Sequence, residues 1–106
     1  MPNPRMNVER TLTIPSDHPA LPGHFPGHPI VPGVVVLDEV IETLKRRYGG
    51  QLLVTGLPAV KLSSPLKPEE PLVIAIESVD GGTAAFTCRV GSRLIASGSI
   101  HFRVPG

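Results

Sequence analysis

The sequence predicts an α+β domain in which one long helix packs on a face of an antiparallel sheet. Three observations support this fold class. One segment repeats its apolar residues at helical spacing, four later segments are rich in alternating or β-branched residues, and glycine-containing turns separate the last of these. The chain has 106 residues and no internal repeat or linker, which predicts a single domain over residues 1–106.

The first expected element is a strand. Val8, Leu12 and Ile14 alternate with polar residues at the period of two of a half-buried strand, although Arg10 falls on the apolar side. The stretch from Pro15 to Pro32 is rich in proline, which fixes φ and removes a backbone donor. A loop is therefore expected between the first strand and the next element.

A helix is expected after Pro32-Gly33. Apolar residues recur there at i, i+3, i+4, i+7 and i+11, namely Leu37, Val40, Ile41, Leu44 and Tyr48. Gly49-Gly50 is a typical helix stop, and the cations at 45–47 suit a helix C-terminus. The β-branched residues 34–36 also fit a strand, but a helix covered by a sheet accepts apolar residues around its first turn, so the helix is favoured.

Four strands are expected in the rest of the chain, over residues 52–62, 72–79, 86–90 and 94–104. Asp80-Gly81-Gly82 and Gly91-Ser92 are typical of hairpin turns. The expected order is strand, proline loop, helix and then four strands that form an antiparallel meander.

Composition excludes several classes of protein. The net charge is +1 and aromatic residues make up 4%, so the basic field and stacking rings of a nucleic-acid binder are missing. The longest apolar run, Ile30 to Leu37, is far shorter than the about 20 residues of a membrane span. The single Cys88 excludes an intrachain disulfide and no secretion leader is recognisable, so a cytoplasmic protein is expected. A domain this small gains stability from a partner subunit that covers an apolar face.

A specific motif ends the proline loop. His24-Phe25-Pro26-Gly27 is followed by further prolines up to Pro32-Gly33, then by an apolar tetrad and Asp38. This sequence motif resembles that of the FabA/FabZ group of 3-hydroxyacyl-acyl-carrier-protein dehydratases. The segment 60–68 resembles the strand that leads into that family's K-F-x-x-P-x-x-P-G-D turn, and the tail from Cys88 to Phe102 resembles its last hairpin.

The resemblance implies the hot-dog fold, an antiparallel sheet wrapped around a central helix. It also implies a homodimer in which two sheets join edge to edge, with further assembly of dimers left open. In this family the histidine and the carboxylate face each other across the dimer interface, which assigns catalysis to His24 and Asp38. The substrate would be carried on the phosphopantetheine of an acyl carrier protein, with no metal and no other cofactor.

The chemistry suits these residues. Dehydration of a 3-hydroxyacyl thioester takes a proton from C2 and gives one to the hydroxyl at C3, so a base and an acid must flank the same short segment. His24 suits the base. Asp38, on the apolar face of a buried helix, would have its pKa raised by desolvation and would serve as the acid. The amides of Gly33 and Val34, at the helix N-terminus, would stabilise the negative charge on the thioester oxygen.

The chain departs from the family pattern at several positions. Asp38 stands where FabZ-type members carry glutamate and FabA-type members aspartate. Glu42, one turn later, replaces the glutamine of many FabZ members and is a candidate accessory acid. Residues 67–70, Lys-Pro-Glu-Glu, replace the P-G-D turn. The chain is also short, like the dehydratases of aryl-polyene pigment pathways.

Two other functions remain open at this point. A hot-dog thioesterase would use the carboxylate to activate water, and a non-catalytic subunit would serve an active partner. A metal site built from His18, His24 and His28 is disfavoured because these residues have no acidic or cysteine companion. The acyl carrier is acidic in general, and the basic residues expected to guide it are Lys45, Arg46, Lys61 and Lys67.

Overall fold

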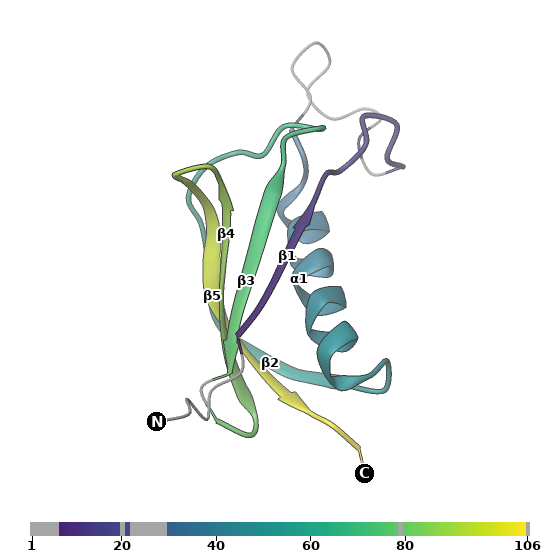
Figure 1. Ribbon diagram of the computed structural model, residues 1–106, viewed down its shortest axis with the longest axis vertical. Coiled ribbons are helices and arrows are strands. Elements are labelled where there is room, and N and C mark those ends of the chain that lie inside the picture. Colours follow the sequence, from purple (N-terminus) through teal and green to yellow (C-terminus); the bar gives the residue numbers. More distant parts are fainter. Residues whose placement is uncertain (1–6, 20, 22–29, 79, 106) are drawn as a thin grey trace.

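The computed structural model describes residues 7–19, 21, 30–78 and 80–105. One helix and five strands follow each other along the chain: β1 (Asn7–Leu12), α1 (Gly33–Tyr48), β2 (Leu53–Leu62), β3 (Leu72–Ser78), β4 (Thr83–Val90) and β5 (Arg93–Arg103). Figure 1 shows α1 lying along one face of the sheet. The predicted α+β class and the predicted order of elements are confirmed.

The sheet has the strand order β1-β3-β4-β5-β2, and all neighbours are antiparallel. Only β3, β4 and β5 form a meander, so the expectation of one continuous meander was wrong. The reason lies between β2 and β3, where residues 63–71 contain three prolines and are too long for a tight hairpin. This connection carries the chain past β5 and β4, so that β1 and β2 become the two edges of the sheet.

The edge strand β2 is irregular. Its pairing with β5 shifts register between Val54 and Gly56 and again between Gly56 and Ala59, and Pro58 lies in the second interval. From Ala59 to Leu62 the register is regular. Proline is tolerated on edge strands because its missing N–H need not serve a neighbour there.

The core lies between the sheet and one face of α1. On the helix, Val36, Val40 and Leu44 are at most 2% exposed, and they belong to the same buried cluster as the inward residues of the sheet. Those residues are Leu72, Ile74, Ile76, Phe86, Cys88 and Ile100. Full burial of such a side chain stabilises the fold by roughly 1.5 to 3 kcal/mol. Tertiary packing therefore outweighs the weak helix propensity of the β-branched residues in the first turn.

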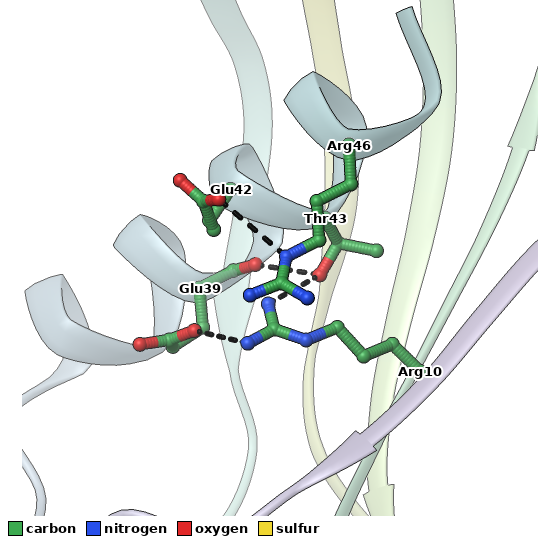
Figure 2. Close-up of polar contacts among 5 residues, drawn as sticks. All are labelled: Arg10, Glu39, Glu42, Thr43 and Arg46. Atoms are coloured by element: carbon green, nitrogen blue, oxygen red, sulfur yellow. Dashed lines mark hydrogen bonds and ion pairs between the residues drawn. The ribbon is translucent and has the colours of Figure 1, made fainter. Parts of the chain in front are cut away.

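Arg10 on β1 faces the helix and is held there by polar partners. Its Nη1 donates to Oγ1 of Thr43 at 3.2 Å, and its Nη2 lies 3.2 Å from Oε1 of Glu39. The Thr43 side chain, which is 1% exposed, donates in turn to the carbonyl of Glu39 at 2.7 Å. Figure 2 shows these contacts between β1 and α1. They explain why a charged residue interrupts the apolar alternation of the first strand.

Replacing Arg10 with methionine keeps an apolar stem but leaves the half-buried carboxylate of Glu39 without its cation. We expect the Arg10→Met variant to lose about 1 to 2 kcal/mol of unfolding free energy, measured by urea denaturation. The matched control is Arg46→Met. It breaks the exposed ion pair of Arg46 with Glu42, 3.5 Å long, and should cost no more than about 0.5 kcal/mol. Equal losses in both variants would contradict a special role for Arg10.

Candidate active site

Asp38 lies on the side of α1 that the sheet does not cover. At 100° per residue it points away from Val36 and Val40, which face the core. Its side chain is exposed, and Val34, one turn earlier, is 62% exposed. The sequence predicted that Asp38 lies on the apolar face of a buried helix. Among the described residues of one chain, Asp38 is exposed on the face of α1 opposite the sheet, so this expectation was wrong for the single chain.

The N-terminus of α1 provides backbone donors. The N–H of Val35 donates to the carbonyl of Pro32 at 3.0 Å, so the N–H groups of Gly33 and Val34 come before the first hydrogen bond of the helix. Pro32 at the N-cap supplies no side-chain acceptor to them. A Cβ on Gly33 would lie 2.6 Å from Cδ1 of Leu62. Glycine thus lets the end of β2 lie close to the start of the helix.

A pocket of about 350 Å³ opens at this helix terminus. One wall is residues 30–33 with Val36, and the other is residues 62–66 with Ile95. The walls are joined by a hydrogen bond from the N–H of Val31 to the carbonyl of Leu66, 2.8 Å long. The pocket is lined mainly by apolar residues, includes Gly33 in its wall and falls within the volume range of small-molecule sites.

Glu42 lies one turn after Asp38 on the same exposed side of α1. Its carboxylate is 3.5 Å from Nε of Arg46. A dashed line marks this ion pair in Figure 2. Glu42, the candidate accessory acid, is therefore paired with Arg46, four residues further along the helix.

The structure brings Gly33, Val34, Asp38 and Glu42 together on three turns of one helix. His24, the predicted base, lies outside the described residues, as does His28. Sequence reasoning missed the wall formed by residues 62–66, because it is far from the motif in sequence. A usable signal was present in Leu62, an apolar residue at the end of a strand that directly precedes a polar, proline-rich stretch.

Among the described residues we also looked at the cysteine, at groups that could bind a metal ion and at the length of the helix. Cys88 is fully buried, and desolvation raises the pKa of its thiol to about 12, so it stays protonated and unreactive. No group of three or more histidine, cysteine or acidic side chains that could hold a metal ion is found in the described part of the chain. Within those same ranges, no helix has the length and apolar character needed to span a bilayer.

The edge strand β2 carries exposed apolar side chains. Leu57, Val60 and Leu62 are 43%, 39% and 57% exposed. We call these three residues and Val34 the β2 surface. Its Leu62 also lies against Gly33 and lines the pocket. The β2 surface is thus continuous with the proposed site.

Comparison with known proteins identifies the family of the chain. The model of the ApeI-like family, described as ApeI dehydratase, matches residues 2–99. The 3-hydroxyacyl-[acyl-carrier-protein] dehydratase FabZ of Chlamydia trachomatis serovar L2 is 32% identical over 108 aligned residues, which cover 90% of this chain and 69% of that protein.

Two solved structures share the fold. The dehydratase heterocomplex ApeI:P from Xenorhabdus doucetiae has a TM-score of 0.80 at 21% identity and covers 92% of each chain. The fluoroacetyl-CoA thioesterase FlK has a TM-score of 0.73 at 14% identity, covering 93% of this chain and 86% of that one. Identities this low establish the hot-dog fold alone, which a dehydratase and a thioesterase have in common. The family match and the FabZ relative are more specific, and they show that the chain belongs to the ApeI-like dehydratases of the FabA/FabZ type.

Proposed function

We propose that this protein removes water from a 3-hydroxyacyl thioester on an acyl carrier protein and forms the trans-2-enoyl thioester. The proposal depends on one observation in this member of a dehydratase family, which is how Asp38 and the first backbone amides of α1 are placed beside the pocket. Asp38 lies little more than one turn from the Gly33 and Val34 amides, and Gly33 lines an apolar pocket. The proposed reaction needs no metal and no cofactor other than the phosphopantetheine that carries the substrate.

In the proposed mechanism His24 accepts the proton from C2 of the substrate. The electron pair of that C–H bond moves toward the thioester carbonyl, and the negative oxygen is stabilised by the amide of Gly33 at the positive end of α1. The pair then returns to form the C2–C3 double bond as the C–O bond at C3 breaks. Asp38 gives its proton to the departing hydroxyl, which leaves as water. Transfer of the proton from His24 back to Asp38 restores both residues.

An acid of this kind must be protonated at the start, which exposure to water disfavours. We propose that a second copy of the chain covers the β2 surface and thereby encloses Asp38. Two features support this proposal. β2 is an edge strand with one side unpaired, and it exposes apolar side chains next to the helix terminus. The base would then come from the other copy, as the motif implies.

We infer that the acyl carrier approaches beside the pocket. Lys61 and Lys67 are exposed and flank the pocket wall formed by residues 62–66. The positive charge of Arg46 is offset by its ion pair with Glu42, and Lys45 is half-buried. Of the four basic residues considered from sequence, Lys61 and Lys67 are therefore the best placed to attract an acidic carrier.

The catalytic roles are tested with purified protein and a 3-hydroxyacyl carrier substrate, with the products identified by mass spectrometry. We expect His24→Ala and Asp38→Asn each to lower kcat by about 100-fold or more, since each removes one proton-transfer group. Glu42→Gln should lower kcat by less than about tenfold if Glu42 is only accessory. Release of a free acid by the wild type would favour a thioesterase, and binding without turnover would favour a non-catalytic subunit. Either result would contradict the proposal.

The second copy is tested by light scattering. We expect the wild type to have the mass of two 11.3 kDa chains. Leu57→Lys combined with Val60→Lys should give a monomer without dehydratase activity, because charges replace apolar contacts on the β2 surface. The matched control places two lysines at Thr11 in β1, the opposite edge strand, and at Thr13 directly after it. Both residues are exposed, and the variant should remain dimeric. A monomeric wild type would contradict the proposal of a second copy and would point to a different chain as partner, since the similar ApeI:P structure is a heterocomplex.

A further inference from the structure

Arg10 connects the sheet to α1 at two points. All six residues of β1 pair with β3, so the backbone of Arg10 is fixed by the sheet. Its guanidinium contacts the Glu39 carboxylate and the Thr43 hydroxyl, both at 3.2 Å, as Figure 2 shows. Because these two residues are four apart, they lie about 6 Å from each other along the helix axis and in nearly the same direction around it.

The contact between Arg10 and the helix is directional. The hydroxyl of Thr43 donates to the carbonyl of Glu39 at 2.7 Å, so its oxygen serves Arg10 as an acceptor. A guanidinium is a planar fork of donors, so both acceptors must lie where the fork points. Thr43 is 1% exposed, and neither Thr43 nor Arg10 is among the described residues that line the pocket beside Gly33. An effect of either residue on turnover would therefore be indirect.

Stability alone gives little reason for an ion pair at this place. The side chains of Arg10 and Glu39 are 21% and 26% exposed, so both charges lose part of their hydration. Two apolar side chains of similar size are often as stable in such surroundings. The ion pair adds a preferred direction, which apolar contacts between α1 and the sheet do not supply.

The rotation of α1 determines where the proposed acid points. Asp38 directly precedes Glu39, so the two side chains are about 100° apart around the helix. A side chain of this kind ends about 5 to 6 Å from the helix axis. A rotation of only about 10° would therefore move the carboxyl of Asp38 by about 1 Å. A displacement of this size can lower the rate of a reaction by about 100-fold.

We propose that Arg10 is a positioning residue, which fixes the rotation of α1 through Glu39 and Thr43 and thereby sets the direction of Asp38. This inference rests on the proposed function, because it takes Asp38 as the acid. A residue with only a structural role would lower turnover no further than its effect on Tm explains. A positioning residue changes turnover even where Tm is kept.

The main test replaces both charged partners together. Arg10→Met combined with Glu39→Met keeps two unbranched side chains and the net charge of the chain, and it leaves neither charge without its partner. Tm should therefore stay within about 4 °C of the wild type. We expect kcat for the 3-hydroxyacyl carrier substrate to fall about tenfold or more, with KM changed by less than about threefold, because the acid is displaced.

Two single variants serve as controls. Glu39→Gln keeps an oxygen acceptor for Arg10, so kcat should stay within about threefold of the wild type. Ile100→Val removes one methylene from a fully buried side chain on β5, far in sequence from the helix. It should lower Tm by about 4 to 8 °C and change kcat by less than about twofold.

The orientation of α1 is measured without substrate. Residual dipolar couplings of the α1 amides, recorded by NMR, change when the helix rotates relative to the sheet. We expect these couplings to change in the double methionine variant and to stay as in the wild type in Glu39→Gln.

Three results would overturn the positioning role: unchanged couplings in the double methionine variant, wild-type kcat in that variant, or an equal loss of kcat in Ile100→Val. A wild type that dehydrates no substrate, together with changed couplings in the double methionine variant, would instead overturn the proposed function. The control of helix rotation by Arg10 would then still stand.

Discussion

A single helix can bury only one stripe of its surface against a single sheet, and this constraint governs the rest of the molecule. The stripe with Val36, Val40 and Leu44 is used for the core. The stripe with Val34 and Asp38 has no partner within the described part of the chain. The core residues and the proposed acid Asp38 therefore lie on opposite sides of the same helix. The core holds α1 in place, and the uncovered side can be completed by another chain.

Polar contacts fix the helix where apolar packing alone would allow it to rotate. Apolar contacts are not directional, whereas the guanidinium of Arg10 must meet both Glu39 and the hydroxyl of Thr43. Glu39 precedes Val40 and directly follows Asp38, so the rotation that satisfies Arg10 also sets the direction of the neighbouring carboxylate. The first strand thus contributes to the geometry of the site without lining it.

Local features of the fold could be predicted from sequence, and non-local features could not. The helix and its end at Gly49 follow from spacing and from a typical stop signal, since both depend on neighbouring residues. The pairing of β2 with β5 instead of β3 depends on contacts between distant segments, which periodicity does not encode. The break in alternation at Arg10 was visible, but its partners lie about thirty residues away and are identified only by the fold.

The same distinction applies to the site. The motif placed Gly33, Val34 and Asp38 on one helix correctly, because it spans adjacent residues. The role of His24 remains a prediction. The exposure of Asp38 could not be predicted, since it depends on what the rest of the chain leaves uncovered. Nor does a glutamate at position 69 indicate the left-handed backbone that Glu69 has in the structure, because residue type signals that conformation only for glycine, asparagine and aspartate.

The irregularity of β2 has a consequence for solubility. A long, flat and apolar edge strand invites repeated strand addition and can seed fibrils. Pro58 and the two register shifts interrupt this edge, so that the unbroken stretch from Ala59 to Leu62 is only a few residues long. A short stretch of this kind is enough to align one neighbouring strand, and too little to template an extended aggregate.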